Sequence, residues 1–125
     1  MGDSLARFAA LSLLVPAVGG AHHSWARYDG DNIFEIDGTV TRVEWASPHV
    51  FMYFDHLEDD GSMTAWTMEL DPPTLLRRYG LRHDTIQPGM TIKVTGVRAV
   101  SGAPMMRGVR IELEDGTVHR VSSRA

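Results

Sequence analysis

The chain has 125 residues, of which 22% are charged, and its formal net charge at pH 7 is −4. This length supports one small domain with a single modest core. The acidic excess argues against nucleic acid as a partner, because proteins that bind phosphate backbones carry a basic surface. The absence of cysteine excludes disulfides, thiolate metal sites and a cysteine nucleophile.

Near the N-terminus, residues 8–18 form an uncharged apolar run, and the small residues Gly-Gly-Ala follow it at 19–21. This arrangement is typical of a secretory signal peptide and its cleavage site. The run is too short to span a bilayer core of about 30 Å at about 1.5 Å per residue. We therefore expect residues 1–21 to be a signal peptide, cleaved before His22 or, alternatively, before Ala21. The mature protein would be periplasmic and would have no membrane span.

Two histidines, His22 and His23, follow the predicted cleavage site. If His22 is the first residue of the mature chain, its α-amine and its Nδ1 can chelate one metal ion. A further imidazole would complete a three-nitrogen set that suits Cu(II). His49 is the better candidate for this third position, because it follows the rigid Pro48, whereas the backbone constrains His23.

Cleavage before Ala21 predicts copper binding with a different geometry. His23 would then be third from the free amine, where amine, backbone amides and imidazole can enclose Cu(II) or Ni(II) in a square plane. The candidate metal ligands are therefore His22, His23 and His49, and copper is the expected cofactor. The alternative is that the histidine pair is an ordinary surface feature and that His49 only caps a strand.

Alternating apolar residues begin near Ile33 and predict an all-β domain. The first predicted strand covers residues 33–45, and Val43 and Trp45 lie out of phase with the residues before them, which indicates a β-bulge in a long, bent strand. A third strand is predicted over residues 63–70. The side chains expected to face inward from the first two strands are Phe34, Ile36, Gly38 and Val40, then Val50, Met52 and Phe54.

A short helix and further strands are predicted after residue 70. The Asp-Pro-Pro-Thr segment at 71–74 indicates a helix start, and Gly80 indicates its end. Strands are expected over residues 91–99, 106–113 and 117–121, with 122–125 as a loose tail. The side chains expected to face inward from residues 106–113 are Val109, Ile111 and Leu113.

This order of elements predicts an all-β fold with one short helix, an oligonucleotide/oligosaccharide-binding (OB)-like barrel of five to six strands. A small open β-sandwich with a helical plug is the alternative. The expected organisation is a signal peptide (1–21), an N-terminal arm (22–32), the OB-like barrel domain (33–121) and the tail (122–125). Such barrels host many unrelated sites, so the fold alone assigns no function.

Other residues are weaker candidates for a site. Phe51, Tyr53 and Trp66 could form a ligand-stacking platform, and Met105 and Met106 could offer thioether ligands to Cu(I). The remaining histidines, His56, His83 and His119, are expected to be solvated surface residues. No nucleophile elbow is present, so we expect a protein that is not an enzyme.

The chain resembles a family of small exported bacterial proteins of unknown function. The resemblance rests on four elements: His-His-Ser-Trp at 22–25, Gly-Thr-Val at 38–40, Trp-Ala-Ser-Pro-His at 45–49 and Leu-Arg-Arg-Tyr-Gly at 76–80. It implies export and a β-rich domain, and it implies no activity. By position, it marks His22, His23, Trp45 and His49 as residues of any functional site.

Three functions are therefore considered, of which a copper enzyme acting at a histidine-brace centre is the least favoured. The first is an exported periplasmic binding module that holds copper through the mature N-terminal histidines and His49. The second is a structural or protein-interaction β-barrel domain of the cell envelope, whose partner is another envelope protein and which binds no metal. The sequence does not determine the oligomeric state.

Overall fold

The computed structural model describes residues 25–124, so the predicted signal peptide, His22 and His23 lie outside the described residues. The elements of the described part are β1 (Tyr28–Glu44), β2 (Phe51–Leu57), β3 (Met63–Glu69), α2 (Pro73–Arg78), β4 (Thr91–Ala99), β5 (Met105–Leu113) and β6 (Val118–Arg120). The predicted all-β class with one short helix is thus confirmed for residues 25–124.

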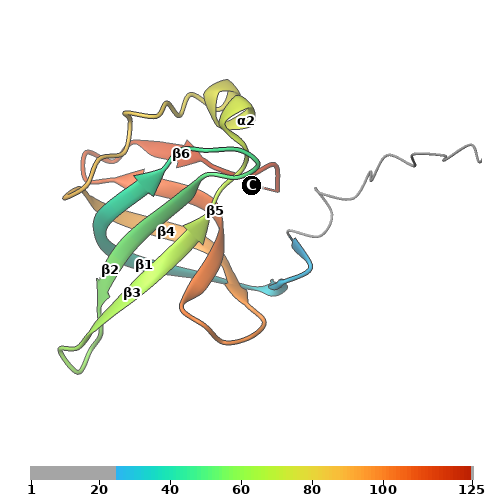
Figure 1. Cartoon of the computed structure of the whole chain (residues 1–125). Helices are drawn as coiled ribbons and strands as arrows, with labels where there is room; N and C mark the ends of the chain where they lie inside the picture. The colour runs from blue at the N-terminus through green and yellow to red at the C-terminus, as the bar shows by residue number, and fades with distance from the viewer. Residues whose placement is uncertain (1–24, 125) are drawn as a thin grey trace, which may run out of the picture.

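Five of the strands close into a ring. β1 pairs antiparallel with both β2 and β4, while β2 pairs with β3 and β4 pairs with β5 in the same sense. The ring is closed by a parallel pairing in which Thr67–Glu69 of β3 lie beside Met105–Arg107 of β5. The order β1-β2-β3-β5-β4, with α2 between β3 and β4, confirms the OB-like arrangement. Figure 1 shows α2 at one end of this ring and the β2–β3 and β4–β5 turns at the other.

β1 is long because it pairs with two neighbouring strands along different parts of its length. Its first half pairs with β4, its second half pairs with β2, and its register with β2 shifts between Val40 and Arg42. This shift is the bulge predicted from the sequence. Gly38 is required where β1 crosses β2, because a Cβ there would lie 2.7 Å from the carbonyl oxygen of Asp55. β1 also begins earlier than predicted, at Tyr28, so part of the expected arm belongs to the barrel.

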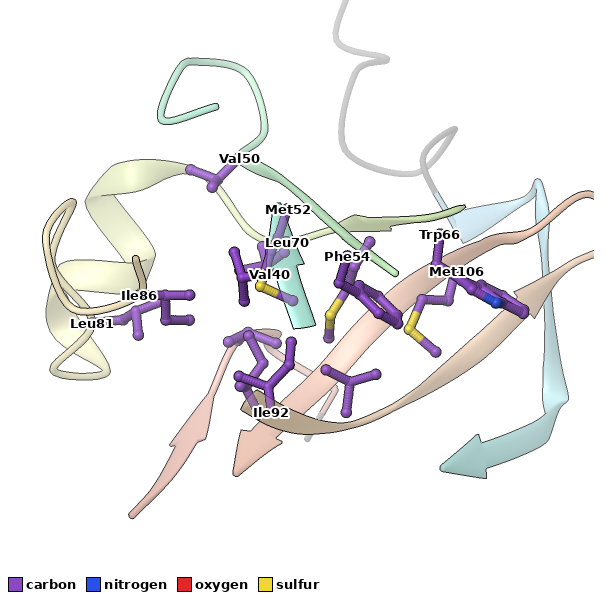
Figure 2. Close-up of a cluster of buried hydrophobic side chains, with 14 of the residues drawn as sticks. Val40, Val50, Met52, Phe54, Trp66, Leu70, Leu81, Ile86, Ile92 and Met106 are labelled. Carbon is purple, nitrogen blue, oxygen red and sulfur yellow. The ribbon is translucent and has the colours of Figure 1, made fainter. Parts of the chain in front are cut away.

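One hydrophobic core fills the ring. Met52, Phe54 and Met68 are fully buried, and Figure 2 shows Leu81 and Ile86 toward the helical end of this core, with Trp66 and Met106 away from it. Burial of apolar surface stabilises the folded state by about 25 cal/mol per Å² removed from water. This burial stabilises the fold without any disulfide.

The predicted inward phase of β5 is wrong at Val109. Thr95 pairs with Arg110, but the next residue, Gly96, pairs with Gly108, so Val109 is the extra residue of a bulge. Val109 is consequently half-buried and outside the core, whereas Ile111 is fully buried as predicted. Gly96 permits this close pairing, because a Cβ there would lie 2.5 Å from the Arg107 carbonyl oxygen.

Of the described residues in the predicted tail, Ser122 is packed against the barrel, whereas Ser123 and Arg124 are exposed. Ser122 is fully buried, and its hydroxyl accepts a hydrogen bond from the backbone N–H of Arg124 (2.9 Å). The side chain of Arg120 donates to the carbonyl oxygen of Ser122 (2.8 Å). The sequence does not reveal this packing, because the polar residues after Val121 are typical of a free tail.

Candidate functional site

The strongest candidate site is a buried polar cluster at the junction of β3 and β5. Trp66 and Met68 of β3 and Leu70 directly after it are buried in the core, so the intervening Glu69 faces the outside of the barrel. Its neighbour across the parallel pairing is Arg107, which alternates in the same way with Met106. Both charged residues are nonetheless buried, with 0% and 1% of their surface exposed.

The N-terminal segment covers this junction. Tyr28, Val97 and Ala99 form a second, smaller apolar cluster, against which Trp25 and Met105 pack. The indole ring of Trp25 also contacts two guanidinium groups, at 4.9 Å from that of Arg107 and 4.5 Å from that of Arg124. The segment is therefore anchored by apolar contact and by cation–π contacts.

Both carboxylate oxygens of Glu69 have partners. The Tyr28 hydroxyl donates a hydrogen bond to Oε2 (2.6 Å), and the exposed Arg27 guanidinium lies 3.5 Å from the same oxygen. The other oxygen, Oε1, lies 3.3 Å from Nδ1 of His49, whose side chain is 17% exposed. His49 reaches Glu69 from the loop between β1 and β2, directly after a cis peptide bond between Ser47 and Pro48.

Arg107 links Glu69 to a second carboxylate. Its Nη1 donates to the backbone carbonyl oxygen of Glu69 (2.9 Å), and its Nη2 pairs with Oδ1 of the buried Asp71. The Tyr79 hydroxyl donates to the other oxygen of Asp71 (3.2 Å). We call Tyr28, His49, Glu69, Asp71 and Arg107 the junction cluster. Its compact, charge-assisted contacts hold charges that would otherwise be costly to bury.

The surroundings favour the neutral forms of two members of this cluster. Burial lowers the pKa of His49, an effect that Arg107 strengthens and that Glu69 and Asp71 oppose. Burial also raises the pKa of Tyr28, and the hydrogen bond to Glu69 raises it further, because an ionised phenolate could not donate that bond. A neutral imidazole and a neutral phenol therefore flank the Glu69 side chain.

Among the predicted metal ligands, the structure places His49 in this cluster, while His22 and His23 lie outside the described residues. Within residues 25–124, no group of three or more His, Cys, Asp or Glu side chains is arranged to hold a metal ion. Any metal site at the junction cluster therefore needs ligands from the preceding residues, and the described chain begins two residues after His23.

Several other sequence candidates do not reach this site. Trp66 faces the core, 5.6 Å from the ring of Phe34, so the predicted stacking platform does not form. Tyr53 is instead covered by the Arg42 guanidinium at 4.1 Å. Trp45 packs against the core, and Met106 is fully buried within it.

The other histidines also differ from the junction cluster. His83 is exposed as predicted, and His119 is half-buried. His56 is not a free surface residue: it lies on β2, and its Nδ1 is 2.7 Å from the Asp37 carbonyl oxygen. None of these three contacts a buried carboxylate in the way that His49 does.

Sequence reasoning missed the residues around His49. Glu69 and Arg107 occupy outward positions of alternating strands, where charged side chains are normally solvated. The only local signal was the pair of acidic residues that flanks Leu70, Glu69 and Asp71, at the end of an otherwise apolar strand. Tyr28, which donates a hydrogen bond to Glu69, is 41 positions away in the chain.

Comparison with known proteins adds one relationship. Residues 10–108 match the profile of a family described as a family of unknown function, DUF6152. No curated protein and no solved structure matches the chain. Within residues 25–124, no helix has the length and apolar character needed to cross a membrane.

Proposed function

The chain belongs to the family of unknown function DUF6152, and from its site we propose that it is an exported, periplasmic copper-binding module. In this proposal the mature chain begins at His22, whose α-amine and Nδ1 bind Cu(II), and His49 supplies the third nitrogen. His23 is the alternative third ligand. The protein is a binding protein and not an enzyme.

One observation carries the proposal: Trp25 docks on the cluster that holds His49. Its ring lies on the guanidinium of Arg107, which donates a hydrogen bond to the Glu69 backbone, and the Glu69 side chain contacts His49. His22 precedes Trp25 by three residues, which span at most about 11 Å. Tyr28, three residues after Trp25, donates a hydrogen bond to the same Glu69 carboxylate that contacts His49.

The donor types favour copper. An amine and two imidazoles form an all-nitrogen set, and a site of this kind binds Cu(II) more tightly than the other divalent ions of the first transition row. The absence of cysteine removes the thiolate ligands that would favour zinc. A cut before Ala21 would leave copper bound by the terminal Ala21-His22-His23 segment alone, without His49.

A copper titration of processed protein tests the proposal. Protein exported by a Gram-negative host is first shown by mass spectrometry to begin at His22, and is then titrated with Cu(II) in a calorimeter. We expect one equivalent to bind, and we expect His49→Ala to weaken binding. The matched control is His83→Ala, which removes an exposed histidine and should leave the affinity unchanged.

A second arm tests the terminal amine. One extra residue ahead of His22 removes the amine from chelation distance, so binding should weaken sharply. If native and extended termini bind copper equally well, or if the protein stays uncleaved in the cytoplasm, the copper proposal fails. The interaction-domain hypothesis would then replace it.

A further inference from the structure

The Glu69 carboxylate joins two parts of the chain that the proposed copper site must bring together. Its Oε2 accepts a hydrogen bond from Tyr28 and lies near Arg27, and both residues belong to the segment that follows His22 and His23. Its Oε1 contacts Nδ1 of His49 in the loop before β2. The buried Glu69 side chain thus contacts both the N-terminal segment and the loop before β2.

The position of this carboxylate selects one nitrogen of His49. A neutral imidazole has one N–H and one lone pair. A carboxylate 3.3 Å from Nδ1 favours the tautomer with the proton on Nδ1, because negative charge attracts the positive end of an N–H and repels a lone pair. The lone pair is then on Nε2. In many metal proteins a carboxylate behind the imidazole fixes the ligand in this way.

We infer that Glu69 is the positioning residue of the proposed copper site. Through Oε1 it orients the His49 ring so that Nε2 is the metal-binding atom, and through Oε2 and Tyr28 it holds the segment that delivers His22. Glu69 itself does not bind the metal. This inference rests on the proposed function, and it adds which atom of His49 binds and what holds the two halves of the site together.

Three variants separate this role from a merely structural one. Glu69→Gln keeps the shape of the side chain but removes its charge, and Cu(II) affinity should fall by about 10- to 100-fold, as is typical when a residue behind a metal ligand is changed. Tyr28→Phe removes only the hydrogen bond from the segment, and the loss of affinity should be smaller. The matched control is Tyr79→Phe, which removes a comparable hydroxyl–carboxylate bond to Asp71 (3.2 Å) and should leave copper affinity unchanged.

Thermal unfolding establishes which variants are folded. If Glu69→Gln does not fold, the comparison of Tyr28→Phe with Tyr79→Phe decides. Lower copper affinity in the Tyr28 variant alone supports the inference, and equal affinities overturn it. Copper affinity that is unchanged in a folded Glu69→Gln protein also overturns the inference, while the proposed copper function stands.

A copper-free measurement tests the orientation of His49 independently. Long-range ¹H–¹⁵N correlation spectra identify which ring nitrogen is protonated. In the wild-type protein near pH 8, we expect His49 to carry its proton on Nδ1, and we expect this preference to weaken in Glu69→Gln. A proton on Nε2 in the wild type overturns the inference. Failure of the wild type to bind copper would overturn the proposed function first, whatever the tautomer.

Discussion

Glu69 and Arg107 are direct neighbours across the parallel β3–β5 pairing, and both are buried although both face away from the barrel core. The N-terminal segment contributes to this burial, because its Trp25 and Tyr28 contact Arg107 and Glu69 respectively. The outer surface of the barrel is therefore buried at this junction. The buried side chains contact both His49 and the N-terminal segment.

Arg107 is predicted to be essential for stability. Arg107→Met leaves Asp71 buried without its cation and removes the hydrogen bond to the Glu69 backbone. Removing one partner of a buried ion pair typically destabilises a protein by about 3–5 kcal/mol. Urea unfolding of the variant should show a loss of this order.

The control for this prediction is Arg110→Met on the same strand. Arg110 is exposed, and its guanidinium lies 3.6 Å from Glu35 at the surface. Exposed pairs of this kind contribute about 0–1 kcal/mol. Equal losses for the two variants would show that the junction cluster is not buried in solution.

Trp25 is predicted to hold the N-terminal segment on the barrel. Trp25→Ala removes its apolar packing beside Tyr28 and its contacts with two guanidinium groups. Hydrogen–deuterium exchange at the backbone amides of residues 26–28 should become faster, while exchange in β2 stays unchanged. Trp25→Phe should restore part of the protection, since a smaller ring still stacks on Arg107. Unchanged exchange in Trp25→Ala would mean that the segment docks by other contacts.

Because of the bulge in β5, we expect substitutions at Val109 and Ile111 to affect folding differently, although both residues were predicted to face inward. Ile111→Asp should unfold the domain, because it places an unpaired charge in the core. Val109→Asp should leave a folded protein, because Val109 is the half-buried extra residue of the bulge. Far-UV circular dichroism and thermal unfolding distinguish the two. A folded Ile111→Asp protein would show that the strand phase described for β5 is wrong.

Stability is predicted to fall at alkaline pH because of Tyr28. The pKa of this phenol is raised in the folded protein from its ordinary value of 10.0, so the folded state keeps the proton that the unfolded chain releases. The contribution of Tyr28 to stability is complete below pH 10 and is lost as the pH rises above it. In urea unfolding between pH 9 and pH 11, Tyr28→Phe should show a shallower decline than the wild type. Parallel curves would contradict the buried hydrogen bond to Glu69.

Much of the fold could be predicted because its signals are local. The alternation of apolar residues and the turn residues between them predicted β4 with its observed bounds, and the phase change after Val40 predicted the bulge in β1. The phase of β5 could not be predicted in this way. It depends on the close pairing of Gly96 with Gly108, which are not neighbours in the sequence.

Of the residues in the junction cluster, only His49 could be predicted from the sequence. A histidine after a proline at the start of a strand is visible in the sequence, but the burial of Glu69 is not. Alternation correctly places Glu69 on the outside of β3, and contacts with residues distant in the sequence, Tyr28 and His49, help to remove it from water. The anchoring role of Trp25 was missed for the same reason, because the sequence does not show which part of the barrel its ring meets.

The location of bound copper tests the central claim most directly. Cu(II) broadens the NMR signals of nearby nuclei, so one equivalent added to ¹⁵N-labelled protein that begins at His22 maps the site. We predict that broadening is centred on the amides of His49, Val50 and Glu69 and on the segment before Tyr28. Broadening centred on His56, His83 or His119, or broadening that leaves His49 unaffected, would contradict a copper site at the junction cluster.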